Sequence, residues 1–187
     1  MNTEPRRLST AEERRETVLR TAIGAFAARG YFGTTTGEVA KAAGISQAYV
    51  YRLFPNKEAL FTAVVEHCFT RVRGALERGA AEVASSEAQA VLDSMGDAYA
   101  RLISDNDLLL VQLHAQAAAV SEPAIREAVR AGYARTVEYV RGASGGSEEQ
   151  IQKFFAAGTL CHLIVSLDAS SLDAPWTRTL AAGIVHY

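Results

Sequence analysis

The sequence of 187 residues has few cysteines, only two. Cys68 and Cys161 are too far apart to suggest a disulfide framework or a zinc-ligand cluster. The first residues lack the apolar core of a signal peptide, and no apolar run approaches the roughly 18 residues of a membrane-spanning helix. We therefore expect a cytoplasmic protein without membrane contact, metal or cofactor.

Proline is also scarce, and its four positions favour a helical chain. Pro5 lies in a polar N-terminal arm, and the other three lie at expected helix boundaries, where the missing N–H is tolerated. Apolar residues recur at three- and four-residue spacing, and no alternating strand pattern appears. We predict an all-α protein of about nine helices, the longer ones covering residues 9–28, 56–78, 87–104, 107–120, 123–141, 147–168 and 175–186.

Residues 34–57 predict two short helices joined by a tight turn. Thr35 and Glu38 have the spacing of a capping box, and Ser46 suits the cap of the second helix. Gly44 ends the first helix because glycine tolerates the left-handed backbone needed there. Two helices joined through such a turn, over residues 35–54, are typical of a helix-turn-helix that reads DNA.

The second helix of this pair has one apolar side, Val50 and Phe54, and a surface suited to DNA. Side chains able to contact base edges are Gln47, Ala48, Tyr49 and Tyr51. Side chains able to hold phosphates are Thr35, Thr36, Ser46, Arg52 and Lys57. Residues 1–57 contain nine Lys and Arg against five Asp and Glu, and the remainder ten against sixteen. A basic end on an acidic body indicates contact with double-stranded DNA through one end only.

A wider stretch, residues 16–60, reads ETVLRTAIGAFAARGYFGTTTGEVAKAAGISQAYVYRLFPNKEAL. It resembles the DNA-binding domain of the TetR family of bacterial transcriptional regulators, most clearly in Arg29-Gly30-Tyr31, Ala43-Gly44-Ile45-Ser46, Tyr51, Phe54 and Lys57-Glu58. Tyr49 and Leu53 depart from the residues that the family often has there. The resemblance implies a homodimer that binds a palindromic operator and is released by a small-molecule effector.

On this interpretation, residues 1–60 form the arm and a three-helix DNA-binding domain, and residues 61–187 a helical ligand-binding and dimerisation domain. The arm contains Arg6 and Arg7, which either contact DNA or belong to a solvated tail. The family resemblance also implies a pocket in the second domain. The residues expected to line it are His67, Met95, Tyr99, Gln112, His114 and Gln116, and each has the alternative of an ordinary core or surface residue.

The last two helices have a broad apolar side. It comprises Phe154, Phe155, Gly158, Cys161, His162, Val165, Trp176 and Leu180. A monomer could bury this side as core. A helix-turn-helix protein that reads a two-fold operator needs a second copy, so we interpret the apolar side as the dimer interface.

Two enzyme-like patterns remain as weaker alternatives. Residues 142–146, Gly-Ala-Ser-Gly-Gly, match the G-x-S-x-G string around Ser144, but that motif needs a strand before it. The pairs His67-Cys68 and Cys161-His162 could supply metal ligands, yet adjacent residues on a helix point about 100° apart. The preferred function is a ligand-released repressor. A ligand-independent dimeric regulator is the first alternative, and a small helical enzyme using Ser144 the remote one.

Overall fold

The computed structural model describes residues 11–104 and 106–183. Within these residues the chain forms nine α-helices and one short 3₁₀ helix, and no strand. The elements are α1 (Ala11–Gly33), α2 (Thr36–Ala42), α3 (Gln47–Leu53), α4 (Lys57–Glu82), α5 (Ala88–Ile103), α6 (Asn106–Ala118), α7 (Pro123–Ser144), α8 (Glu148–Ser166), η1 (Ala169–Ser171) and α9 (Pro175–Ala181). The all-α prediction is confirmed.

Helices α2 and α3 form the expected helix-turn-helix. The Thr35 hydroxyl accepts from the Glu38 backbone N–H, and the Glu38 carboxylate accepts from the Thr35 N–H, so the capping box is present. Gly44 has φ +66°, in the left-handed region that glycine occupies without strain. The Ser46 hydroxyl then caps α3. Val39, Ala40, Val50 and Phe54 are buried between the two helices and α1.

Helix α1 bends sharply near its end. Gly30 has φ +67° and ψ −176°, which interrupts the helix and lets residues 31–33 turn toward α2. The ring of His114, on α6, fills the space beside Gly30, because a Cβ there would lie 2.6 Å from His114 Nδ1. His114 Nε2 lies 3.2 Å from the Ala27 carbonyl oxygen and donates to it, since a carbonyl only accepts. α6 therefore packs directly against α1 at the bend.

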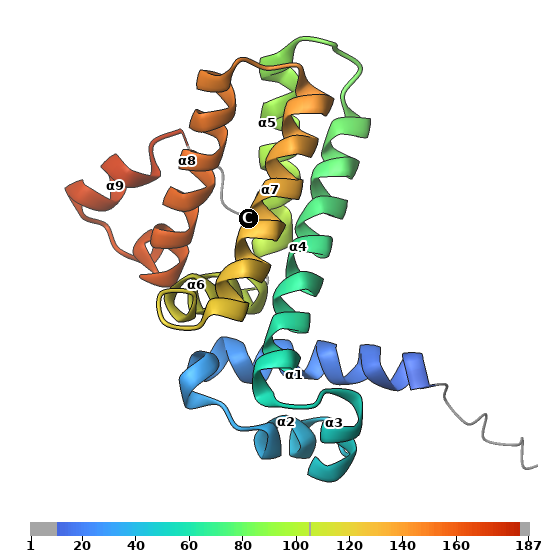
Figure 1. Cartoon of the computed structure of the whole chain (residues 1–187). Coiled ribbons are helices and arrows are strands. Elements are labelled where there is room, and N and C mark those ends of the chain that lie inside the picture. Colours follow the sequence, from blue (N-terminus) through green and yellow to red (C-terminus); the bar gives the residue numbers. More distant parts are fainter. Residues whose placement is uncertain (1–10, 105, 184–187) are drawn as a thin grey trace, which may run out of the picture.

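Helix α4 connects the DNA-binding end to the body (Figure 1). It begins beside α2 and α3 and runs upward against α5 and α7, while α6 lies across the junction. One apolar core extends from Val18 and Phe26 of α1, through Phe61 and Val64 of α4, to Ile125 of α7. A second lies higher, between α4, α5, α7 and α8. The DNA-binding end and the body therefore share one hydrophobic core, and no linker separates them in the described residues.

The helix boundaries differ from those predicted at several places. α1 continues three residues past Gly30, and α4 reaches Glu82, beyond the expected end near residue 78. α8 ends at Ser166, where Asp168 adopts φ 48° and the chain turns through η1. α9 ends at Ala181, short of the predicted residue 186. The arm with Arg6 and Arg7, and the Ser9 cap, lie outside the described residues.

Candidate DNA-binding surface and ligand cavity

The surface of α3 turned away from the core carries most of the side chains predicted to contact DNA. Ser46, Gln47, Ala48, Tyr51 and Arg52 are exposed, and Tyr49 is half-buried. α3 lies at the end of the molecule opposite the α4–α5 connection (Figure 1). The hydroxyls, the amide and the guanidinium on this surface are suited to base edges and phosphates.

Three of these side chains form an ordered network. Gln47 Nε2 donates to the Thr36 hydroxyl over 2.9 Å, and the Thr36 hydroxyl donates to the Tyr51 hydroxyl over 3.0 Å. Thr36 itself is only 5% exposed. The prediction that its hydroxyl contacts a phosphate does not fit this position. The hydroxyl lies beneath Gln47 and Tyr51 and fixes the direction in which both point.

The cations at this end are held against aromatic rings. Lys57 Nζ donates to the Tyr31 carbonyl over 2.9 Å and lies 4.5 Å from the centre of that ring. An ammonium has three N–H donors, so two remain for a phosphate. Arg14 donates to the Tyr49 hydroxyl over 3.4 Å, and the Arg15 guanidinium lies 4.4 Å from the centre of the Phe54 ring. Stacking of this kind fixes the position of a charge that a flexible side chain would otherwise move.

Arg14 and Arg15 were missed by the sequence analysis, as was exposed Lys41 at the end of α2. The two arginines lie on α1, outside the helix-turn-helix, and Arg14 is 35 residues from Tyr49 in the sequence. A helical projection of α1 could have placed both on its polar side. Thr35 is exposed, but its hydroxyl already donates to Glu38.

A cavity of about 570 Å³ opens in the upper body, between α4, α5, α6, α7 and α8. This lies within the 300–1,000 Å³ typical of small-molecule sites. Its walls are mainly apolar and aromatic, and include Phe69, Leu92, Tyr133, Phe154 and Phe155. The charged residues among its described lining are Asp93, Asp97 and Lys153. Asp93 accepts from Gln89, and Lys153 pairs with Glu149 over 2.7 Å.

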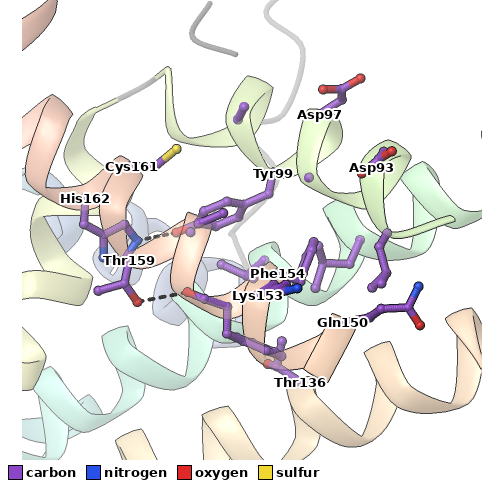
Figure 2. Close-up of a pocket in the computed structure, with 18 of the residues that line it drawn as sticks. Asp93, Asp97, Tyr99, Thr136, Gln150, Lys153, Phe154, Thr159, Cys161 and His162 are labelled. Carbon is purple, nitrogen blue, oxygen red and sulfur yellow. Dashed lines mark hydrogen bonds between the residues drawn. The ribbon is translucent and has the colours of Figure 1, made fainter. Parts of the chain in front are cut away.

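Three polar side chains that line the cavity, Tyr99, His162 and Gln112, form one chain of contacts. Tyr99 on α5 and His162 on α8 point toward each other (Figure 2), with 2.5 Å between the Tyr99 hydroxyl and His162 Nε2. The Tyr99 hydroxyl also lies 3.5 Å from Gln112 Oε1, and Gln112 Nε2 donates to the Leu108 carbonyl. Burial raises the pKa of Tyr99 and lowers the pKa of His162. Both groups are therefore uncharged at neutral pH.

The structure brings two of the six predicted pocket residues, Tyr99 and Gln112, to this cavity. The other four lie elsewhere. Met95 is fully buried in the second core, and His114 packs against α1. His67 lies 3.8 Å from Glu16, and Gln116 donates to the Tyr133 hydroxyl beside a much smaller void. His162 also lines the cavity, although the sequence analysis places it in the dimer interface.

Helix α8 has two apolar sides, and the predicted interface mixed them. Phe154, Phe155, Gly158, Cys161 and His162 line the cavity, and Val165 packs against a small core with Ile103 and Leu109. The outward side carries Ala156, Leu160, Leu163 and Leu167, at the i, i+4, i+7 and i+11 spacing of one helix face. Leu163 and Leu167 are 44% and 55% exposed.

Trp176, on α9, is a further exposed apolar side chain, 46% exposed. Leu180 is half-buried on the same helix. Of the predicted interface residues, Trp176 is thus the one with a large exposed apolar side chain.

The enzyme-like patterns have ordinary structural explanations. Ser144 is buried in the last turn of α7, where its hydroxyl donates to the Val140 carbonyl, and Gly145 is a left-handed cap. A helix, and not the strand that the motif needs, precedes it. Burial raises the pKa of Cys68 to about 12 and raises that of Cys161, so neither thiol ionises at neutral pH. The described residues contain no group of three potential metal ligands and no helix able to span a membrane.

Comparison with known proteins agrees with the helix-turn-helix. Residues 18–64 match the family model described as bacterial regulatory proteins, tetR family. The HTH-type transcriptional regulator CymR of Pseudomonas putida is 31% identical over 138 residues, which are 72% of this chain and 64% of that protein. The negative transcriptional regulator IcaR of the biofilm operon icaADBC in Staphylococcus epidermidis is 34% identical over 55 residues, 29% of this chain and 30% of that protein. This chain spans 27–64% of the length of the curated relatives that it matches.

The similarity of fold extends over nearly the whole chain. The crystal structure of FadR from Bacillus subtilis, in complex with stearoyl-CoA, superposes with a TM-score of 0.67. The match covers 89% of this chain and 94% of that one at 19% sequence identity. At this identity the likeness concerns the fold alone.

Proposed function

This chain belongs to the tetR family of bacterial regulatory proteins, and on that premise we propose a homodimeric repressor that a small molecule releases from a palindromic operator. The observation that carries the proposal is the ordered polar surface of α3, joined by one continuous helix, α4, to a body with a large cavity. Repression follows if the dimer occupies DNA that the transcription machinery needs.

For the DNA contact, α3 enters the major groove. Gln47, Ala48, Tyr49 and Tyr51 then face base edges, while Ser46, Arg52 and Lys57 hold phosphates. Thr35, exposed at the start of α2, contacts a phosphate by turning its hydroxyl hydrogen away from Glu38. Arg14 joins the phosphate contacts beside Tyr49. The network through Thr36 supports this assignment, because it orders two of the reading side chains before DNA binds.

For dimerisation, we place the interface on the outward apolar surface of α8 and α9, namely Ala156, Leu160, Leu163, Leu167 and Trp176. Two such surfaces facing each other across a two-fold axis form a four-helix contact. The pairing orients two copies of α3 toward successive major grooves, as a palindromic operator requires. The boundary between the DNA-binding and the ligand-binding parts falls within α4, near Leu60.

For release, one helix, α4, lines the cavity and also begins beside the reading surface of α3. Phe69, Val72 and Leu76 of α4 line the cavity, and Lys57 begins the helix beside α3. A ligand that fits better when α4 is displaced stabilises a dimer whose two copies of α3 no longer match the groove spacing. A ligand-independent regulator would have no need of a 570 Å³ cavity, so the cavity favours the ligand-released form.

The test is operator selection from a random DNA library, followed by binding at several salt concentrations. We expect a palindromic sequence and an affinity that falls steeply with salt. Gln47→Ala should select a sequence relaxed at particular base pairs, while Gln152→Ala, exposed on α8, should select the wild-type sequence. Folded protein that enriches no sequence at low salt would refute the DNA-binding function.

A further inference from the structure

The polar groups inside the cavity restrict the chemistry of its ligand. We propose that the ligand is an uncharged, ring-containing compound with a hydroxyl group, and that the hydroxyl binds between Tyr99 and Gln112. This inference rests on the ligand-released function proposed above and specifies the ligand. It follows from the hydrogen positions in the Tyr99–His162–Gln112 chain, from the charges around the cavity and from its walls.

The hydrogen of His162 belongs on Nε2. His162 is 4% exposed, and its Nδ1 is buried without a hydrogen-bond partner. A buried nitrogen lone pair without a partner costs less than a buried N–H without one. Nε2–H therefore donates to the Tyr99 oxygen, and the Tyr99 O–H points along the chain to Gln112 Oε1. The Gln112 amide in turn donates to the Leu108 carbonyl.

One hydrogen bond of this chain, from Tyr99 to Gln112, is long and therefore weak. The Tyr99 oxygen and Gln112 Oε1 are 3.5 Å apart, whereas O–H···O hydrogen bonds are usually 2.5–3.0 Å. Both residues line the cavity. A ligand hydroxyl beside them can accept the Tyr99 hydrogen and donate its own hydrogen to Gln112 Oε1. A carbonyl would leave Gln112 Oε1 without a hydrogen, and a plain hydrocarbon would offer neither function.

The charges disfavour an anionic ligand. Among the described lining residues, Lys153 is the one cation, and its ammonium is exposed and paired with Glu149. Two carboxylates, Asp93 and Asp97, lie on α5 at the same cavity (Figure 2). A carboxylate or phosphate inside would lose its hydration without a cation to replace it. The cavity is therefore unsuited to an acyl-CoA head group like that of the ligand in the FadR complex.

The cavity walls favour a ligand that contains rings. Phe69, Tyr133, Phe154 and Phe155 line the cavity together with aliphatic side chains. Aromatic side chains favour stacked or edge-on contact with a second ring. Gly96 and Gly158 widen the cavity, because a Cβ at either position would meet only Phe154 or Tyr99, at 3.9 Å.

Three probes with one ring system test the proposal: 2-naphthol, 2-methylnaphthalene and 2-naphthoate. Their affinities for the full-length protein are measured by calorimetry at neutral pH, without DNA. We expect 2-naphthol to bind roughly tenfold more tightly than either of the others. Tyr99→Phe should remove about that factor for 2-naphthol and leave 2-methylnaphthalene nearly unchanged. Tyr139→Phe, on α7 outside the cavity lining, should change neither affinity.

Gly96→Leu supplies a second variant, because Gly96 lines the cavity and a Cβ there lies beside Phe154, so the added side chain takes up ligand space and should weaken 2-naphthol and 2-methylnaphthalene alike. Tighter or equal binding of 2-naphthoate would overturn the proposal, as would no binding of 2-naphthol up to its solubility limit. Operator release is assayed separately. Selective 2-naphthol binding without release would refute the release mechanism but not the ligand class. Release by 2-naphthoate alone would refute the ligand class but not the release mechanism.

Discussion

Replacing Thr36 with valine keeps the shape of a buried β-branched side chain and removes one hydroxyl. That hydroxyl accepts from Gln47 and donates to Tyr51, so the variant loses both hydrogen bonds. Gln47 is exposed and Tyr51 is 46% exposed, so water replaces the lost contacts and the free energy of unfolding should fall by only about 1 kcal/mol. For a chain of this size, the Tm should fall by roughly 2–4 °C.

The effect on DNA binding should be larger. In the variant, Gln47 and Tyr51 must be ordered when DNA binds, and each immobilised side chain costs about 0.5–1.5 kcal/mol. Together they predict a loss of about 1–3 kcal/mol, or roughly 5- to 150-fold in operator affinity. Affinity for unrelated DNA should change little, because phosphate contacts remain. The salt dependence should stay the same.

The assay is a titration of the selected operator and of unrelated DNA at several salt concentrations, with Thr70→Val as the control. Thr70 donates its hydroxyl to the Glu66 carbonyl on the exposed side of α4, far along the chain from α3. Unchanged operator affinity in folded Thr36→Val protein would refute the argument that the network orders the reading side chains. An equal loss of affinity for unrelated DNA would instead restore Thr36 to the phosphate contacts, since such contacts do not depend on sequence.

Three further predictions concern other parts of the molecule. Lys57→Ala should weaken binding to every DNA sequence and reduce the salt slope by about one; an unchanged slope would remove Lys57 from the phosphate contacts. Leu163→Asp should make the protein monomeric in light scattering and weaken operator binding at least about tenfold, whereas Gln152→Asp on the same helix should leave a dimer. Burial lowers the pKa of His162, so its contribution to stability is complete above about pH 6.5 and is lost as the pH falls below that value. His162→Gln should therefore lose less Tm than wild type between pH 7 and pH 5, and equal losses would contradict the assignment.

The sequence was most informative where local chemistry decides the structure. The capping pair Thr35–Glu38 forms as predicted, because it depends only on residues three apart. Gly44 adopts the left-handed backbone expected of it for the same reason. Apolar periodicity placed the long helices, although α4 continued past its expected end because its last turns pack against α5.

The sequence was least informative where a helix side or a polar residue could contact either of two neighbours. Phe154 and His162 lie on the broad apolar side of α8, but nothing local tells whether that side meets the body or a second copy. Thr36 resembles an exposed cap residue until Gln47 and Tyr51 are placed above it, eleven and fifteen residues later. Arg14 and His114 depend on still longer separations, 35 and 87 residues, which no local pattern encodes.

The contact between Gly30 and His114 also matters for chimeras in which the DNA-binding domains of two regulators of this fold are exchanged. The imidazole occupies the volume of any side chain at position 30, and its N–H is used by the Ala27 carbonyl. A DNA-binding domain grafted onto this body therefore needs a glycine at that position. A body grafted onto this DNA-binding domain needs a flat ring with a hydrogen-bond donor at position 114. A chimera joined within α4 that ignores this pair would keep both modules intact and still misalign them.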